Sequence, residues 1–189
     1  DITNENFLKD LPGSMKTFRS KITGTFKEEK TLPAPNELKL KIGAQVIMTK
    51  NNKKDWFNGT IGTIIKFNEN SITVKIGNSN YYVTKATWDR ISYKYNKNTK
   101  KIEEEVLGTF EQYPMRLGWA VTIHKSQGLT LNNVYIDLGR SAFASGQTYV
   151  ALSRCRTLEG IKMARPLRKS DIIINPMIEE FYEEFFLQN

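Results

Sequence analysis

The chain has 189 residues, of which 39% are hydrophobic and 25% are charged, a composition typical of a folded globular protein and not of a disordered one. Its 28 Lys and Arg residues against 20 Asp and Glu give a net charge of +8, which favours a polyanionic partner. The segment 140–169 alone holds seven basic residues and one acidic residue. Most of the net positive charge is therefore concentrated in one part of the sequence.

Cysteine and histidine are scarce in this chain. The single Cys155 excludes an internal disulfide, and one Cys with one His cannot assemble a zinc site from its usual ligands. No apolar run approaches the roughly 20 residues that span a bilayer, and the amino terminus has no signal-peptide pattern. We expect a cytoplasmic protein, in the bacterial cytoplasm or nucleoid, without a membrane partner.

The first third of the chain predicts one helix and two strands. Residues 1–11 form a short amphipathic helix that ends at Pro12, and 14–37 form a polar, irregular connector. The segment 38–42 alternates apolar and polar residues with the period of a strand, and a second strand follows at 44–49.

Three polar residues, Thr49, Lys50 and Asn51, close the second of these strands. Hydroxyl, ammonium and amide groups can all bond to nucleic-acid phosphates without reading the base sequence. We predict that these residues contact a nucleic-acid backbone.

Residues 56–114 show short strands separated by tight turns. The strands are predicted at 60–67, 71–76 and 81–84, and the connectors between them are rich in Asn and Gly. This pattern is typical of a small antiparallel barrel of the SH3 kind, inserted into a larger domain. Tyr81, Tyr82, Trp88 and Tyr93 offer faces on which bases could stack, although aromatic residues at period 2 more often belong to a core.

The rest of the chain alternates strands and helices. Strands are predicted at 119–123, 134–138 and 160–164, with a helix at 147–154 before the last of them. Strand, helix and strand at this spacing imply a parallel sheet. A final helix begins at Asn175 as its cap and is expected to bury its apolar face, formed by Ile178, Phe181 and Phe185.

Two stretches of this second part place polar side chains where ligands usually bind. TIHKSQGLT at 122–130 follows the predicted strand directly, and loops at the carboxyl ends of sheet strands commonly hold ligands. YVALSRCR at 149–156 places Arg154 at the end of a short helix. A guanidinium is a planar fork of donors that suits phosphate.

These two stretches resemble motifs V and VI of superfamily I DNA helicases, in the Pif-like and RecD-like branch. The resemblance extends upstream through LKIGAQVIMTKN at 40–51 and WFNGTIGTI at 56–64, so it covers most of the chain. It implies a second RecA-like domain at 1–55 and 115–189, interrupted by the SH3-like barrel at 56–114. It also implies single-stranded DNA and an upstream RecA-like domain as partners, ATP and Mg²⁺ as cofactors of the full-length protein, and movement from 5′ to 3′.

The resemblance assigns roles to individual residues. Arg154 takes the place of the arginine finger that reaches the γ-phosphate of ATP. Arg156 is assigned to the nucleotide site beside it, where it supports Arg154, although contact with DNA or a simple solvated role also fits this residue. Gln127 and Gly128 face the nucleotide. The DNA backbone is contacted by Thr122, His124, Lys125 and Ser126.

Most of the machinery for phosphoryl transfer is missing from these residues. Lys125 and Ser126 look like the end of a GxxxxGKS loop, but Trp119 and His124 stand where this loop needs glycine. A pair of carboxylates for Mg²⁺ is also not found. We therefore expect that the chain alone binds no cofactor and does not hydrolyse ATP.

Two other functions are compatible with parts of the sequence. The chain could be a non-catalytic module that binds single-stranded nucleic acid through its barrel and basic region. A hydrolase built on Ser126 or Ser153 with His124 and Asp137 is less favoured, because Ser126 lies only two residues from His124 and no GxSxG elbow is present.

Overall fold

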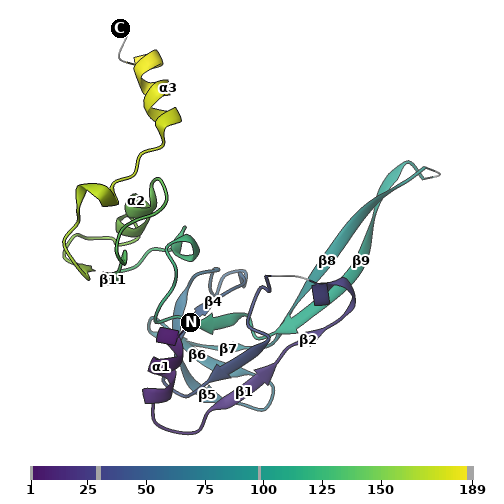
Figure 1. Ribbon diagram of the computed structural model, residues 1–189. Coiled ribbons are helices and arrows are strands. Elements are labelled where there is room, and N and C mark those ends of the chain that lie inside the picture. Colours follow the sequence, from purple (N-terminus) through teal and green to yellow (C-terminus); the bar gives the residue numbers. More distant parts are fainter. Residues whose placement is uncertain (1, 29–30, 98, 187–189) are drawn as a thin grey trace. The chain divides into compact units, whose positions relative to one another are not determined.

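Figure 1 shows a computed structural model of the chain, which describes residues 2–28, 31–97 and 99–186. The chain divides into two compact units, a first unit of Asp1–Ala120 and a second unit of Val121–Asn189. The first unit is built mainly of antiparallel strands, whereas the second combines short helices with one parallel strand pair. The fold is therefore of the mixed α/β class. No helix among the described residues is long and apolar enough to cross a membrane.

The centre of the first unit is a five-stranded antiparallel sheet. In spatial order its strands are β10 (Met115–Leu117), β4 (Gln45–Met48), β5 (Ile61–Phe67), β6 (Ile72–Ile76) and β7 (Ser79–Val83). The predicted strands of the insert are confirmed by β5, β6 and β7. The sheet also includes β4 and β10, which lie outside 56–114 and pair with each other. The barrel closure and the two domain boundaries stay predictions.

One face of this sheet carries the main core of the first unit. Alternation along the strands places Val46 and Met48 of β4, Ile64 of β5 and Val74 of β6 on the buried side, each fully shielded from solvent. Helix α1 (Ile2–Asp10) adds Leu8 to the same cluster. Each such side chain contributes about 1.5–3 kcal/mol through burial, so this cluster accounts for much of the stability of the first unit.

Residues 14–37 are more regular than predicted. They contain β1 (Lys16–Arg19), β2 (Lys21–Ile22) and the 3₁₀ helix η1 (Gly24–Glu28), and β1 pairs antiparallel with β3 (Glu37–Leu40). The prediction of an irregular connector was wrong because the polar residues of these short strands are exposed, while their backbone bonds come from segments far along the chain.

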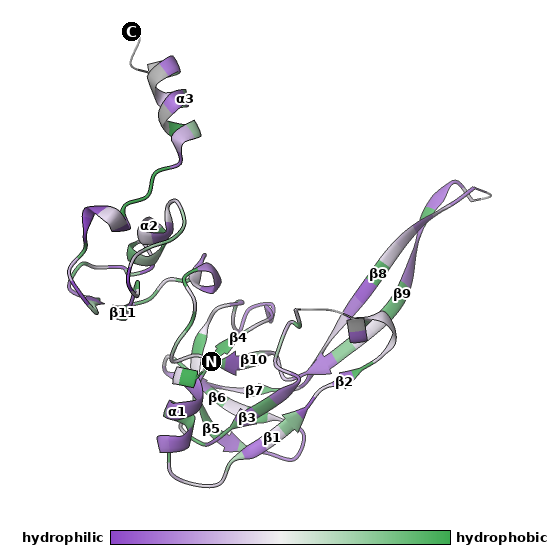
Figure 2. Cartoon of the chain, viewed as in Figure 1, coloured by the Kyte–Doolittle hydropathy of each residue, from purple (hydrophilic) through white to green (hydrophobic). Residues whose placement is uncertain are grey.

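A long two-stranded ribbon, formed by β8 (Ala86–Asn96) and β9 (Lys101–Gln112), was not predicted. β2 pairs with the base of β9, and Figure 2 shows hydrophilic and hydrophobic stretches alternating along both strands. On one face Tyr93 and Tyr95 are exposed, and on the other Lys94 forms an ion pair with Glu105. Tyr93 is therefore not a core residue.

Gln112, at the end of β9, has a polar side chain that forms several hydrogen bonds in the interior of the first unit. Its side chain is fully buried, and its Nε2 lies 3.0 Å from the Phe18 carbonyl, 3.2 Å from that of Pro35 and 3.3 Å from that of Asn36. Its Oε1 accepts a bond of 2.9 Å from the Tyr113 N–H. One side chain thus joins β9 to the backbone around β1 and to the segment before β3.

The second unit contains a parallel pair, β11 (Val134–Ile136) and β12 (Ile161–Met163), with helix α2 (Gln147–Leu152) between them in the sequence. This parallel pairing confirms the predicted strand, helix and strand. Ile136, Leu138 and Ala151 are buried together and form a small core. The RecA-like assignment of this unit stays a prediction.

The predicted strand at 119–123 does not form. The N–H groups of Trp119 and Ala120 both donate to Oδ1 of Asn4, at 3.0 and 2.9 Å, and the Ala120 carbonyl accepts from its Nδ2. These backbone groups are therefore not available for strand pairing. Immediately afterwards the chain turns into the 3₁₀ helix η2 (His124–Ser126).

The last helix, α3 (Pro176–Phe186), begins as predicted. Oδ1 of Asn175 accepts a bond of 3.1 Å from the Met177 N–H, which is the expected cap. The expected burial of its apolar face was wrong, since Ile178, Phe181 and Phe185 are each at least half exposed. Helical spacing gathers apolar side chains on one face, but it does not supply a surface to cover them.

Candidate nucleic-acid and nucleotide site

The predicted DNA-binding residues of the second unit lie on the tight turn around η2. The Ser126 N–H donates to the Thr122 carbonyl at 3.0 Å, and the Lys125 N–H donates to Oγ1 of Thr122 at 3.4 Å. Oγ of Ser126 donates to the Ile123 carbonyl at 2.7 Å, and this side chain is buried. The two hydroxyl groups therefore hold the turn, whereas the side chains of His124 and Lys125 are exposed to solvent.

Gln127 and Gly128 continue from this turn. The Gln127 N–H donates to the His124 carbonyl at 3.3 Å, and its side chain is exposed. Gly128 has a φ of +79°, and a Cβ placed there would meet nothing within 4 Å. Glycine is needed here for its left-handed backbone and not for close packing, so the space beside it is open to a ligand.

Arg154, just beyond the end of α2, is folded back onto neutral oxygen atoms. Its Nε lies 3.0 Å from the Val150 carbonyl, its Nη1 lies 3.3 Å from the Leu129 carbonyl, and its Nη2 lies 2.9 Å from Oγ of Ser153. Among the described residues no carboxylate forms an ion pair with it. Nη1 and Nη2 each keep a second N–H, so both the charge and two donors remain available to an anion.

Backbone hydrogen bonds join the residues after α2 to the residues after η2. The Leu131 N–H donates to the Arg154 carbonyl at 2.8 Å, and the Arg156 N–H donates to the Leu131 carbonyl at 3.0 Å. The Arg156 side chain is exposed. The two predicted motifs are thus held side by side within the second unit.

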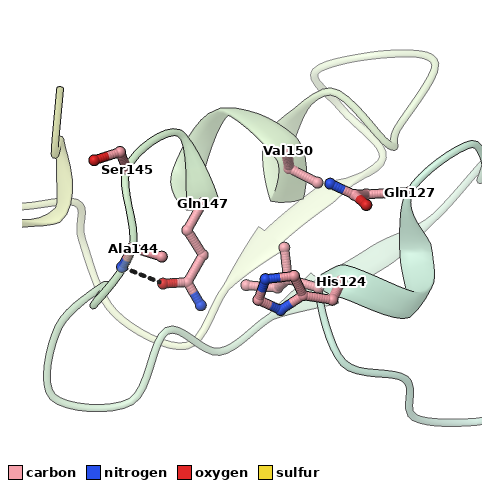
Figure 3. Close-up of a pocket in the computed structure, with 7 residues that line it drawn as sticks. His124, Gln127, Ala144, Ser145, Gln147 and Val150 are labelled. Atoms are coloured by element: carbon pink, nitrogen blue, oxygen red, sulfur yellow. Dashed lines mark hydrogen bonds between the residues drawn. The ribbon is translucent and has the colours of Figure 1, made fainter. Parts of the chain in front are cut away.

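A pocket lies between η2 and α2 (Figure 3). Its lining residues come from both motifs and from the loop before α2: Ile123, His124, Gln127, Ala144, Ser145, Gln147 and Val150. Oε1 of Gln147 accepts from the Phe143 N–H at 2.9 Å and from the Ala144 N–H at 3.3 Å. Gln147, which was not predicted as a site residue, is therefore held at the pocket with a fixed orientation.

Thr49, Lys50 and Asn51 belong to the first unit, and the side chains of Lys50 and Asn51 already have partners within it. Nζ of Lys50 donates to the Thr87 carbonyl and lies 5.0 Å from the centre of the Trp88 ring. Oδ1 of Asn51 accepts from the Asn58 N–H at 2.6 Å. Oγ1 of Thr49 is buried without a hydrogen-bond partner among the described residues. Their predicted contact with DNA would require Lys50 and Asn51 to exchange these partners.

The described residues do not fit a Mg²⁺ site. No group of three or more His, Cys, Asp or Glu side chains that could hold a metal ion occurs within 2–28, 31–97 and 99–186. Arg154, Gln127 and the pocket instead offer hydrogen-bond donors. These donors are of the kind that phosphate oxygens accept, but the described residues of the second unit supply no carboxylate cluster for a metal ion.

The comparisons with known proteins agree on one family. No family model matches the chain. It is 33% identical over 188 residues to the ATP-dependent DNA helicase Pif1 of Bdellovibrio bacteriovorus, covering 96% of this chain and 40% of that protein. It is 34% identical to PIF1 of Xenopus laevis, covering 97% of this chain and 28% of that protein.

The solved structures give the same result. Unliganded Pif1 from Bacteroides sp matches 98% of this chain with a TM-score of 0.85 and 34% identity, over 43% of its own length. The chain belongs to the Pif1-like family of superfamily I helicases. The matching segment spans 28% to 40% of the two Pif1 relatives above, so the activity of a whole Pif1-like helicase is not carried over to it directly.

Sequence reasoning missed one structural feature beside this Pif1-like site, a buried ion pair. Nη1 and Nη2 of Arg165 lie 2.7 Å from the two carboxylate oxygens of Asp171. This carboxylate also accepts from the Arg168 and Ala142 N–H groups, and its side chain is fully shielded. The Asp171 carbonyl accepts from Oγ1 of Thr148 on α2. The pair therefore holds the loop before α2, which contributes the wall of the pocket.

We expect this pair to make the second unit sensitive to acid. The Arg165 guanidinium and the Arg168 N–H hold the pKa of the Asp171 carboxyl well below its usual range. Its contribution is therefore complete above the unfolded pKa of about 3.9 and is lost as the pH falls from there through the folded pKa. Thermal unfolding followed by circular dichroism should shift to lower temperature over this acidic range.

The Asp171→Asn variant should show a smaller shift, because it has no carboxylate to protonate. Glu159→Gln, which changes an exposed carboxylate of the same unit, serves as the control and should show the same acid-induced shift in melting temperature as the wild type. The same acid-induced shift in Asp171→Asn and in the wild type would show that another group is responsible.

Proposed function

We propose that the chain is the C-terminal motor part of an ATP-dependent DNA helicase that moves from 5′ to 3′. In this role it supplies an arginine finger, Arg154, and an edge around η2 that binds the backbone of single-stranded DNA. The observation that carries the proposal is the placement of Arg154, which has no ion-pair partner among the described residues, on a segment joined by hydrogen bonds to the one that exposes His124 and Lys125.

The ligands of related structures support this assignment. Crystal structures exist of Bacteroides Pif1 bound to single-stranded DNA, with a TM-score of 0.77 to this chain, and of the Bacteroides sp protein in complex with ADP-AlF4, with a TM-score of 0.84. Those proteins bind both kinds of ligand that the second unit suits. The predicted roles of Gln127, Gly128 and Arg156 at the nucleotide belong to the same proposal.

The finger would act on charge that develops at the γ-phosphate. A guanidinium placed there stabilises the transition state more than the ground state, and it acts only when the cleft between two motor domains closes. The lysine and carboxylates of phosphoryl transfer, with ATP and Mg²⁺, would belong to an upstream RecA-like domain. The chain alone should therefore show no ATPase activity, and hydrolysis by it at helicase rates would contradict the proposal.

Binding of single-stranded DNA tests the other half of the proposal. Lys125 is exposed and has no ion pair among the described residues. We expect Lys125→Ala to weaken binding of a labelled oligonucleotide several-fold at low salt. Because one phosphate contact is lost, the slope of log K against log salt should become shallower by about 0.7. Fluorescence anisotropy at several salt concentrations measures both quantities.

Lys162→Ala is the matched control, since it removes the same charge from an exposed position on β12 of the same unit. It should change affinity and slope much less. Equal effects of the two variants would mean that the chain binds DNA through its overall charge. In that case a non-catalytic nucleic-acid-binding module becomes the better description.

A further inference from the structure

The carboxamide of Gln147 is held through its oxygen atom, and its nitrogen has no partner among the described residues. Its Oε1 accepts from two backbone N–H groups, those of Phe143 and Ala144, and these bonds fix which end of the carboxamide faces the loop. Figure 3 shows the oxygen turned toward Ala144 and the nitrogen turned toward the side on which His124 lies. No described residue accepts a hydrogen bond from this nitrogen. Two N–H donors are thus oriented and unused.

The rest of the pocket also favours a ligand that accepts hydrogen bonds. Its lining includes the imidazole of His124 and the carboxamide of Gln127, together with the apolar side chains of Ile123 and Val150, and no acidic residue. His124 and Gln127 are exposed and Gln147 is half-buried, so a ligand would replace water as the hydrogen-bond partner of these groups. Phosphate oxygens accept hydrogen bonds and carry no protons to donate at neutral pH, so a phosphate group matches this set of donors.

The walls of the pocket are tied to each other and to Arg154. Nη1 of Arg154 binds the Leu129 carbonyl at the far end of the turn that carries His124 and Gln127. Gln147 is the first residue of the short helix α2, and Arg154 lies two residues beyond its end. The pocket is therefore part of one hydrogen-bonded arrangement with the predicted arginine finger.

We propose that this pocket binds one phosphate group of the single-stranded DNA backbone, and that Gln147 donates hydrogen bonds to it from Nε2. This inference rests on the proposed function and adds Gln147 to the DNA-binding residues. The same chemistry is offered by the phosphates of a bound nucleotide, so the test uses both kinds of ligand.

The Gln147→Glu variant separates the two ends of this side chain. A glutamate keeps one oxygen to accept from the Phe143 and Ala144 N–H groups, but it replaces the two N–H donors with a second, negatively charged oxygen. Affinity for a labelled oligonucleotide at low salt should fall by about tenfold or more, the effect of one hydrogen bond to a charged group. Asn133→Asp makes the same charge change at an exposed position outside the pocket and should change affinity less than about twofold.

A second variant covers the case in which Gln147→Glu fails to fold. Ser145 is exposed at the pocket, so Ser145→Glu places a negative charge there without disturbing a core, and it should weaken binding of the oligonucleotide as well. The full 189-residue chain is titrated with the oligonucleotide by fluorescence anisotropy and, separately, with fluorescent ADP. Melting curves establish that each variant is folded.

The outcomes distinguish this inference from the proposed function. Weaker binding of the oligonucleotide supports the assignment. If only ADP binds more weakly, the pocket binds a phosphate of the nucleotide, and the assignment to the DNA backbone is wrong. If the wild type binds and both folded variants bind both ligands equally well, Gln147 does not contact phosphate and only this inference fails. If the wild type binds neither ligand, the proposed DNA-binding edge fails with it.

Discussion

In a Pif1-like helicase that carries this chain, replacing Arg154 with alanine should lower ATP hydrolysis by about 10³- to 10⁵-fold, the range measured for arginine fingers. Affinity for nucleotide should change far less, because the contact is made most strongly in the transition state. This split between a large loss of kcat and a small change in KM separates a finger from a residue that only binds ATP.

The structure explains why Arg154 can serve in this way. Its three hydrogen bonds all go to uncharged oxygen atoms, and such bonds hold the side chain without neutralising its charge. A carboxylate partner would have to be displaced at a much larger cost when the guanidinium moves to a phosphate. The side chain is therefore positioned in the absence of nucleotide and still able to turn toward it.

Two further variants test this explanation. Arg154→Lys keeps the charge but not the planar fork, so it should lose most of the activity while the protein stays folded. Arg140→Ala removes an exposed arginine from the same unit and should leave ATP hydrolysis nearly unchanged. ATPase activity of Arg154→Ala within about tenfold of the wild type would exclude the finger, given the range expected for one.

The elements predicted well from the sequence are those defined by local patterns. Strands β5, β6 and β7 are rich in β-branched and aromatic residues and are separated by Asn and Gly turns, and Asn175 caps α3 as its residue type favours. Helix α2 was predicted from an apolar stretch that lies between two predicted strands. In each case the information lies within a few residues of the element.

The elements that were missed depend on contacts far apart in the sequence. The ribbon of β8 and β9 is mostly exposed, and its burial does not follow its hydropathy, since Ile91 and Tyr93 of β8 are exposed while Arg90, the neighbour of Ile91, is half-buried. The strand expected at 119–123 is replaced because Asn4, which is distant in sequence, takes its backbone bonds. A local pattern cannot show that a distant side chain competes for the same N–H groups.

The site was predicted from motifs, and the structure adds what motifs do not contain. Both motifs are brought together in the second unit, with His124 and Lys125 exposed and Arg154 close to Leu129. Nothing in the sequence pointed to Gln147 as a site residue, since a glutamine at the start of a helix is usually a solvated surface residue. Only the two N–H groups bound by its oxygen show that its nitrogen is directed into a pocket.

Gln112 is a similar case in the first unit, and its replacement has the second large expected effect. Gln112→Leu preserves the approximate volume of the side chain and makes a fully buried site more apolar. Burial alone would predict a more stable protein. However, the variant leaves the Tyr113 N–H and the carbonyls of Phe18, Pro35 and Asn36 without this partner.

The Asn36 carbonyl keeps a bond of 2.9 Å from the Ser20 N–H. Each buried polar group that loses its partner costs about 1–3 kcal/mol, so we expect Gln112→Leu to destabilise the first unit by about 2–3 kcal/mol. Chemical denaturation followed by tryptophan fluorescence measures this, since all three tryptophans, Trp56, Trp88 and Trp119, lie in the first unit. Phe110→Leu, a change between apolar residues two positions earlier on β9, controls for disturbed packing and should cost less. If Gln112→Leu is as stable as the wild type, water or other protein groups satisfy these backbone atoms, and the link that Gln112 provides between β9 and the segments around β1 and β3 is dispensable.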